Sequence, residues 1–167
     1  MFVARNHKGL LCNALEEKIE KGADFVCPAC SGAVRFKKGK VMQPHFAHIS
    51  LEECRFYREN ESAEHLNLKA ELFRWAVQTE EVEVETFLPA LQQIADLLVD
   101  KRLALEVQCS PLSIERLQER TLSYRQHGYQ VLWLLGRKLW LKDSLTRLQK
   151  DFLYFSQNMG FHLWELD

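Results

Sequence analysis

The spacing of apolar positions divides the chain into a first part with short elements and a second part with longer, regular ones. Residues 61–79 carry apolar side chains three and four positions apart, which predicts an amphipathic helix with Asn60 or Ser62 as its cap. Three strands follow, over residues 81–87, 93–99 and 103–108. After them come a helix over 114–127, capped by Ser113, and a buried strand over 129–135. This α-β-β-β-α-β order predicts an α/β (α+β) domain built on one mixed sheet.

The chain after residue 136 is expected to extend this domain. A short strand over 139–141 precedes a helix that begins near Asp143 and ends at Gly160, and residues 161–166 return as an edge strand. The helix carries one apolar stripe, made of Leu145, Leu148, Phe152, Phe155 and Met159. This stripe should face the core, and a dimer-forming helix is the alternative interpretation.

The first part of the chain shows short strands and turns. One predicted hairpin pairs residues 2–4 with 10–12, and a second pairs 34–36 with 41–42. A short helix is predicted over residues 15–20. No linker rich in proline, glycine or serine separates the two parts. The change of pattern near Arg58 therefore predicts an amino-terminal module over residues 1–58 and a second domain over 59–167.

Two cysteines and two histidines follow the pattern Cys-x2-Cys-x14-His-x2-His, formed by Cys27, Cys30, His45 and His48. Zinc takes four nitrogen or sulfur ligands in a tetrahedron, and two tight pairs joined by a hairpin supply them. The spacing predicts a zinc knuckle. Buried cysteines with surface histidines are the alternative, because His-x2-His is tighter than the usual finger spacing. Cys54 is expected to be a structural thiol.

The formal net charge of −1 gives no overall attraction to nucleic acid, so any such interaction must be local. A basic cluster lies between the predicted ligand pairs and consists of Arg35, Lys37, Lys38 and Lys40. These side chains could hold phosphates or form a solvated turn. The sequence has no apolar run of membrane-spanning length and no signal-peptide pattern, so a cytoplasmic location is expected.

The predicted helix over 61–79 also carries a polar line. Glu61, His65 and Lys69 recur every four residues, and Glu64 lies beside them. Such a line is most often a ladder of salt bridges, so it does not define a site by itself.

Two carboxylates on neighbouring predicted strands are the strongest candidates for chemistry. If residues 100–102 form a three-residue loop, Val99 pairs with Leu103 and Asp96 lies opposite Glu106. Carboxylates at that spacing repel each other unless a cation bridges them, which predicts a Mg²⁺ or Mn²⁺ site. Neutralising either one should then leave the metal-free protein equally or more stable. A different register, with both groups on a wet outer face, is the alternative.

Several groups of residues together resemble the CoiA family of competence proteins. In the second domain they are Glu106-Val107-Gln108-Cys109-Ser110-Pro111, Arg120-Thr121 with Tyr124, Val131 to Gly136, and Glu61-Ser62 followed by His65 and Lys69. In the first part they are Cys27-Pro28-Ala29-Cys30 and Pro44-His45-Phe46-Ala47-His48. The resemblance implies a restriction-endonuclease-like αβββαβ core of the PD-(D/E)XK type behind a zinc-knuckle-like amino terminus. It also implies a Mg²⁺- or Mn²⁺-dependent nuclease, with DNA and recombination or DNA-uptake proteins as partners.

Each expected site residue has a role in this hypothesis. Metal would be held by Asp96, Glu106 and Glu64, water or phosphate would be oriented by His65 and Gln108, and cations would come from Lys69 and Arg120. Gln108 stands where the nuclease motif has lysine, and its amide can orient water but brings no charge. The alternative is therefore an inactive module of the same fold that binds DNA or a recombination protein.

Overall fold

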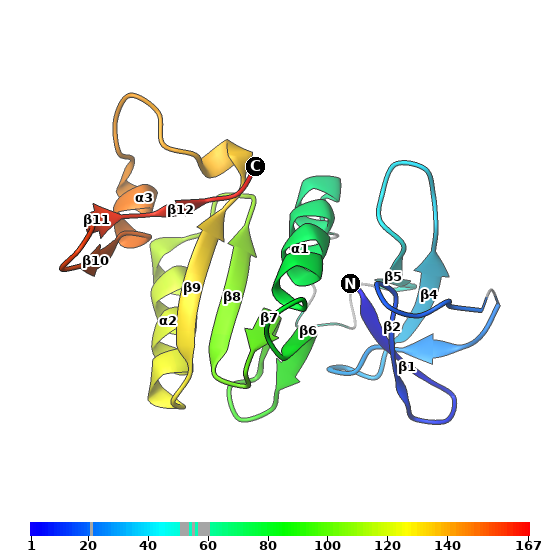
Figure 1. The fold of residues 1–167 in the computed structure, drawn as a ribbon. Helices are drawn as coiled ribbons and strands as arrows, with labels where there is room; N and C mark the ends of the chain where they lie inside the picture. Colours follow the sequence, from blue (N-terminus) through cyan, green and yellow to red (C-terminus); the bar gives the residue numbers. More distant parts are fainter. Residues whose placement is uncertain (21, 51–53, 55, 57–60) are drawn as a thin grey trace.

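The computed structural model describes residues 1–20, 22–50, 54, 56 and 61–167. Within them the second part of the chain is built on a mixed sheet between two helices (Figure 1). The strands in spatial order are β12 (Trp164–Glu165), β9 (Gln130–Leu135), β8 (Leu103–Gln108), β7 (Gln93–Val99) and β6 (Val82–Leu88). β9 is parallel to β8 and β12, whereas β7 is antiparallel to both of its neighbours. The order of elements from α1 (Ala63–Ala76) through α2 (Ile114–Gln126) to β9 is the predicted one.

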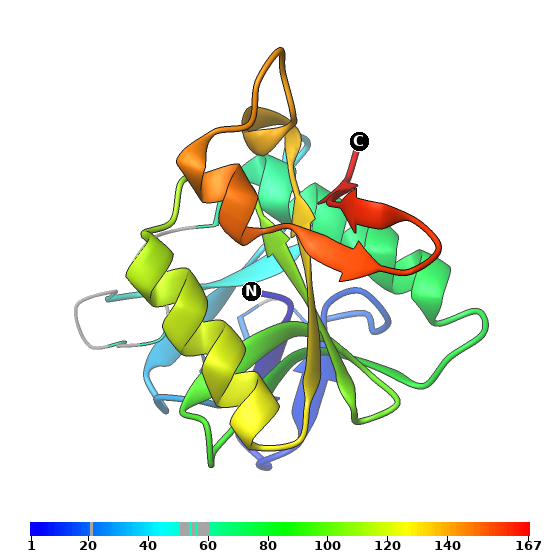
Figure 2. The same cartoon turned by 90° about the vertical axis from the view of Figure 1, so that its left-hand side faces the viewer.

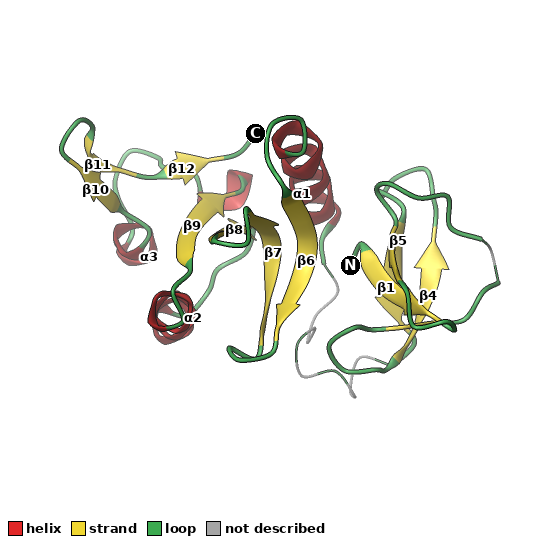
Figure 3. Ribbon diagram, turned by 60° about the horizontal axis from the view of Figure 1, so that its bottom comes forward, coloured by secondary structure: helices red, strands yellow, loops and turns green. Residues whose placement is uncertain are grey.

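Helices α1 and α2 cover opposite faces of this sheet, as Figure 3 shows. One core cluster joins Leu66 and Phe73 of α1 to Leu105 of β8. The other joins Tyr124 of α2 to Trp133 of β9. Because neighbouring residues of a strand point to opposite faces, the apolar strands in the middle of the sheet contribute to both cores.

Both long helices begin at the serines that the sequence indicates. The hydroxyl of Ser62 accepts the backbone N–H of His65, and the hydroxyl of Ser113 accepts that of Arg116. The other predicted cap, Asn60, and the predicted module boundary after residue 58 lie outside the described residues. None of the helices in the described ranges is both long and apolar enough to cross a membrane.

The first part of the chain forms a separate antiparallel sheet. Its order is β2 (Leu11–Asn13), β1 (Val3–Asn6), β3 (Phe25–Val26), β4 (Ala33–Lys37) and β5 (His45–His48). The predicted first hairpin is present as β1 and β2. The second one was placed wrongly, because β4 pairs with β5 while residues 41–42 form bends.

The reason for the second error is burial. Val41 is 83% exposed and gains nothing from pairing, whereas Phe46 of β5 is fully buried. The predicted helix over residues 15–20 is also absent, since those residues form turns and irregular chain.

The amino-terminal sheet packs against α1 and β6, on the side of the central sheet away from α2 (Figures 1 and 2). Phe2 and Val3 enter the core under α1, where they join Leu66, Val84 and Leu97. The two sheets therefore share one hydrophobic cluster instead of being joined only by a linker.

The ladder between β6 and β7 is interrupted in its middle. Val84 pairs with Leu97 and Thr86 with Ala95, but the described ladder contains no pair between Glu85 and Asp96. Glu85 has a φ of 52°, a left-handed conformation that is uncommon for a residue other than glycine. Residues two apart on a regular strand point to the same face of the sheet. Across this break they do not, because Leu97 lies in the core under α1 whereas Ala95 lies in the core under α2.

The chain after β9 differs most from the prediction. A 3₁₀ turn, η1 (Arg137–Leu139), replaces the expected strand over 139–141. The expected long helix is only α3 (Arg147–Asp151), and a hairpin of β10 (Tyr154–Ser156) and β11 (Gly160–His162) follows it. β12 then adds to the sheet edge beside β9, and this edge position was predicted.

The apolar stripe was misleading because only part of it contacts the core. Leu148 and Phe152 pack on the cluster under α2. Phe155 and Met159 are 66% and 57% exposed, and the ring of Phe155 packs on that of Phe161 across the hairpin. Helical spacing was therefore present in residues that lie on or beside one short helix and in a hairpin.

Candidate functional site

The carboxylate of Asp96 lies where β7 and β8 separate. The two strands pair from Val99 with Leu103 to Leu97 with Leu105. Beyond this point the backbone N–H of Val107 donates to Oδ2 of Asp96 at 2.9 Å. A side chain thus replaces a strand carbonyl as the acceptor. We call the place where β7 and β8 separate the opening, and Asp96 holds β8 there.

A buried ammonium, that of Lys69 on α1, is shared by three carboxylates. Its Nζ is 2.7 Å from Oε1 of Glu85 and 3.5 Å from Oδ1 of Asp96, and it donates to Oε1 of Glu61. The side chain of His65, one turn earlier on α1, has Nε2 3.1 Å from Oδ2 of Asp96. We call Glu61, His65, Lys69, Glu85 and Asp96 the Lys69 cluster. It needs this mutual pairing because an unpaired buried charge would cost several kcal/mol.

The pKa values in the Lys69 cluster shift as expected for ion pairs. Burial raises the pKa of Asp96, but the charges of His65 and Lys69 outweigh it and hold the pKa well below its usual range. For Glu61, burial is outweighed by Lys69 and by the α-amino group of Met1, whose nitrogen is 2.5 Å from Oε2, so its pKa is also low. Burial lowers the pKa of Lys69, but the surrounding carboxylates raise it well above the ordinary value. These groups are therefore ionised at neutral pH.

Glu106 contacts the opposite helix, α2. Its Oε1 accepts hydrogen bonds from Nη2 of Arg120 at 2.7 Å and from the hydroxyl of Tyr124. Arg120 also donates to the backbone carbonyl of Ile94 at 3.3 Å, so its guanidinium reaches the opening between β7 and β8 from the α2 side. Burial raises the pKa of Glu106, and Arg120 opposes this rise without cancelling it.

The predicted register is confirmed, but the predicted facing of Asp96 and Glu106 is corrected. Val99 does pair with Leu103 across the three-residue loop. The ladder break then turns Asp96 towards α1, whereas Glu106 points to α2. Each carboxylate has cationic partners of its own, although the negative charge of Asp96 still adds to the rise in the pKa of Glu106. Simple strand alternation could not have predicted this difference.

Two other predicted residues have partners elsewhere. Oε1 of Glu64 accepts the backbone N–H of Arg137 at 2.9 Å, and Nε2 of Gln108 donates to the carbonyl of Ser110 at 2.6 Å. The set of Asp96, Glu106 and Glu64 is therefore not assembled as expected. The described residues at this opening that could hold a metal ion are instead Glu61, His65 and Asp96, whose donor atoms lie within 4.8 Å of one another.

A second group with metal-ligand chemistry lies in the amino-terminal module. Cys27, Cys30, His48 and Cys54 offer donor atoms within 4.8 Å of one another, and we call them the Cys/His group. Sγ of Cys30 is 3.5 Å from Nε2 of His48. Tetrahedral zinc with ordinary Zn–S and Zn–N bonds would place such atoms about 3.6 Å apart. Three thiols and one imidazole therefore fit a structural zinc site in both donor type and spacing.

The turn that presents Cys30 depends on Gly32. Its N–H donates to Sγ of Cys30 at 3.3 Å. A Cβ at this position would lie 3.2 Å from the same sulfur, so a larger residue would crowd the ligand.

The structure replaces the predicted ligand His45 by Cys54. His45 and His48 lie on one strand, β5, and residues three apart on a strand point to opposite faces. Nδ1 of His45 instead pairs with the carbonyl of Gln43 at 2.8 Å. The His-x2-His spacing would bring both rings together on a helix or turn, and the sequence pattern did not show that this segment is a strand.

The predicted basic cluster lies at the surface. Arg35 and Lys37 are on β4, Lys38 and Lys40 follow it, and all four are exposed. Their contact with phosphate stays a prediction.

Two members of the Lys69 cluster were missed or underrated in the sequence. Glu61 was visible only as part of the polar line with His65 and Lys69, and that line was the useful signal. Glu85 occupied an outward position in an alternating strand pattern, and no feature of the sequence indicates its burial.

Comparison with known proteins shows the class to which this arrangement belongs. Residues 61–167 match the description "Competence protein CoiA, nuclease-like domain", and residues 11–57 match "Competence protein CoiA, N-terminal domain". The protein thus combines a nuclease-like α+β domain with a distinct amino-terminal domain. It belongs to the CoiA family of competence proteins, as the sequence motifs indicated.

One curated relative is Competence protein CoiA of Bacillus subtilis (strain 168), which is 30% identical over 159 residues. The match covers 93% of this chain and 40% of the relative, so the chain spans less than half the length of that protein. No solved structure matches the chain.

Proposed function

We propose that this protein hydrolyses phosphodiester bonds of DNA with the help of Mg²⁺ or Mn²⁺, in DNA uptake or recombination linked to competence. The observation that supports this best is the position of Asp96 at the opening between β7 and β8, beside two further donors, Glu61 and His65. The nuclease-like family description supports the same reaction class. We also propose a PD-(D/E)XK-type core for residues 59–167 and a zinc-binding module for residues 1–58.

The residues of the Lys69 cluster fit distinct roles in this reaction. Asp96 and Glu61 would hold the metal ion, with His65 beside them. Glu106, which points to the face of the sheet covered by α2, remains a second carboxylate candidate. When bound, the ion would polarise the phosphate and lower the pKa of a water molecule. Lys69 would stabilise negative charge that develops on the phosphate.

Two further side chains would act without carrying the metal. His65 contacts Asp96 through Nε2, and from this position it would orient the attacking water. Gln108 is partly exposed at the end of β8, and rotation of its amide away from Ser110 would let it orient phosphate or water.

The Cys/His group would hold one structural zinc ion. A closed site with four protein ligands fixes a fold and leaves no position for substrate, so zinc would not take part in the cleavage. The exposed residues Arg35, Lys37, Lys38 and Lys40 would contact DNA phosphates from the same module.

The test is cleavage of single-stranded, duplex and branched DNA in Mg²⁺, Mn²⁺ or EDTA. Asp96→Ala and Glu106→Ala should each lower metal-dependent cleavage by about 100-fold or more. Glu71→Ala removes an exposed carboxylate from α1 and should behave as the wild type. Cleavage that is unchanged in Asp96→Ala would contradict the proposed site.

A second candidate function is DNA or protein binding without catalysis. The observation that favours it is Gln108, which brings no charge and whose amide is turned to Ser110. In that case the wild type binds DNA without cutting any of the substrates. Replacing Arg35, Lys37, Lys38 and Lys40 by alanine should then weaken binding and reduce its dependence on salt, because each phosphate contact releases a counterion.

A further inference from the structure

Glu85 joins the amino-terminal module to the ammonium of Lys69. We propose that Glu85 is a positioning residue, which holds Lys69 in place at the site and fastens the first strand of the amino-terminal module to it. The module would then be part of the active centre and not only an attached DNA-binding unit. The part of this inference that concerns catalysis rests on the proposed function.

The two carboxylate oxygens of Glu85 contact different parts of the molecule, the amino-terminal module and Lys69. Oε2 accepts the backbone N–H groups of Phe2 and Val3 at 2.5 and 3.0 Å. Oε1 is 2.7 Å from Nζ of Lys69. The Glu85 side chain is 1% exposed, so neither contact competes with bulk water. One buried carboxylate therefore neutralises Lys69 and satisfies two backbone donors of another sheet.

The backbone of β6 is distorted at this residue. Glu85 has a φ of 52° and stands opposite Asp96 at the break in the β6–β7 ladder. Strained residues of this kind persist only where their surroundings hold them, and they are concentrated at functional sites. Here the distortion directs Glu85 and Asp96 to the same ammonium.

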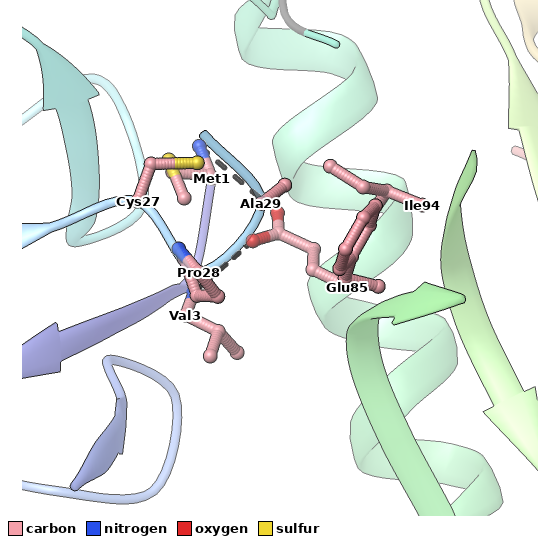
Figure 4. A pocket seen from close by; sticks show the side chains of 8 residues that line it. Met1, Val3, Cys27, Pro28, Ala29, Glu85 and Ile94 are labelled. Atoms are coloured by element: carbon pink, nitrogen blue, oxygen red, sulfur yellow. Dashed lines mark hydrogen bonds and ion pairs between the residues drawn. The ribbon is translucent and has the colours of Figure 1, made fainter. Parts of the chain in front are cut away.

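The amino-terminal module also packs around Glu85 (Figure 4). Glu85 points between Met1 and Val3, and the Cys27-Pro28-Ala29 turn lies beside it against Ile94. The ring of Phe2 lies with its centroid 5.4 Å from Nζ of Lys69. Residues of the turn that carries two candidate zinc ligands thus line one pocket with Glu85 of β6 and Ile94 of β7, the strand that carries Asp96.

Glu85 determines how strongly Lys69 pairs with Asp96. The ammonium donates hydrogen bonds to Glu85 and Glu61, whereas its 3.5 Å distance to Asp96 is longer. Without the charge of Glu85, Lys69 would lose one partner and move closer to Asp96. There it would compete with a metal ion for Asp96 and lie farther from the phosphate, so the change should impair catalysis even when the fold is retained.

The test compares Glu85→Gln, Glu85→Ala and the control Glu83→Gln in the full chain. Glutamine keeps an oxygen that can accept the Phe2 and Val3 amides but loses the charge that pairs with Lys69, whereas alanine loses both functions. Glu83 is exposed on the same strand, so it is a matched control. The readouts are DNA cleavage in Mg²⁺ or Mn²⁺, the position of Nζ of Lys69 in a crystal structure of each variant, and hydrogen exchange of the first strand.

Glu85→Gln should lower cleavage roughly 100-fold and bring Nζ of Lys69 from 3.5 Å to about 3 Å from Oδ1 of Asp96, with exchange of the first strand still slow. Glu85→Ala should in addition speed exchange of that strand, and Glu83→Gln should match the wild type. A Glu85→Gln protein with wild-type cleavage and an unmoved Lys69 would overturn the inference, because Glu85 would then be only an anchor for β1.

Inactive wild-type protein would count against the proposed function, and the position of Lys69 in Glu85→Gln would still decide whether Glu85 positions Lys69. If Glu85→Gln does not fold, Glu85→Asp replaces it, because aspartate keeps the charge but cannot reach both partners. In a folded Glu85→Asp protein Nζ of Lys69 should lie closer to Asp96 than the 3.5 Å of the wild type, and an unchanged position would overturn the inference.

Discussion

The two groups that could bind metal differ in how their charges are balanced. In the Lys69 cluster, the carboxylates are paired with cations of the protein itself, and the pKa values of Asp96 and Glu61 are low as a result. In the Cys/His group, burial raises the pKa of Cys27, and the influences that lower it are hydrogen bonds from neighbouring groups. The first group is thus stable as a network of ion pairs, whereas the second needs a metal ion to favour its thiolates.

This difference separates a structural role of metal from a functional one. Zinc at the Cys/His group would contribute to folding because its ligands are brought together from distant parts of a small module. A divalent ion at the Lys69 cluster would have to bind beside an existing ammonium, so its contribution to stability should be small. The predictions below test this contrast from its largest consequence to its smallest.

Removal of zinc should have the largest effect. Binding to structural zinc sites contributes on the order of 10 kcal/mol, so chelation should unfold the amino-terminal module and shift thermal unfolding to lower temperature. Elemental analysis should find about one zinc per chain in the wild type and none in Cys54→Ser or His48→Asn.

The matched controls for this prediction are His45→Asn and Cys12→Ser, which change the same residue types in the same module outside the group. Both should keep about one zinc per chain. Loss of zinc in His45→Asn together with its retention in Cys54→Ser would show that the Cys/His group has been assigned wrongly.

Replacement of the buried ammonium should have the next largest effect. Lys69→Met leaves carboxylates in a buried site with one cation fewer, which should destabilise the protein by about 3–5 kcal/mol in urea unfolding. Lys101→Met, at an exposed ion pair with Glu81, should change stability by less than about 1 kcal/mol.

Millimolar Mg²⁺ should stabilise Lys69→Met more than the wild type, because the ion can then occupy the position of the ammonium. Equal effects of Mg²⁺ on the two proteins would show that Lys69 does not compete with a cation.

The order of regular elements from α1 to β9 could be predicted because its signals are local. Serine caps, helical spacing and the apolar β9 gave α1, α2 and the sheet strands nearly in their observed places. The three-residue loop also predicted the correct pairing of Val99 with Leu103. These features depend on neighbouring residues, and one sequence contains that information.

The composition of both sites could be predicted only in part, because their final members depend on long-range geometry. A ladder break at Glu85 reversed the direction of Asp96, and the strand conformation of β5 separated His45 from His48. Cys54 joins the Cys/His group, although it belongs to neither of the two tight pairs that the sequence shows. The same limit explains the C-terminal error, where an apolar stripe at helical spacing is divided between α3 and the β10–β11 hairpin.

Neutralisation of Asp96 distinguishes the observed arrangement from the facing carboxylates that the register alone suggested. Asp96 accepts the N–H of Val107 and pairs with His65 and Lys69, so Asp96→Asn should destabilise the metal-free protein by about 1–3 kcal/mol. Urea unfolding in EDTA measures the change, and Asp100→Asn in the exposed loop serves as the control. If Asp96→Asn is as stable as the wild type or more stable, Asp96 and Glu106 repel each other in the metal-free protein, as the register alone suggested.

The smallest effect concerns thiol reactivity. Burial raises the pKa of Cys109 to about 12, and the negative charges of Glu64 and Asp96 add to this rise. At pH 8 its thiolate should therefore be roughly a thousandfold scarcer than that of a free cysteine. In native protein iodoacetamide should label Cys109 very slowly, and urea should remove this protection.

Chelation of zinc tests whether the two regions unfold separately. It should expose Cys27 and Cys30 to labelling while Cys109 stays protected in the second domain. Mass spectrometry of the alkylated peptides distinguishes these sites. Since the pKa of Cys109 is higher in the folded than in the unfolded protein, this thiol favours the fold fully below about pH 8.5. That contribution should be lost as the pH rises towards 12, so the wild type should lose its stability relative to Cys109→Ala over this range. Labelling of Cys109 as soon as zinc is removed would show that the two regions unfold together and that their metal dependence is not separate.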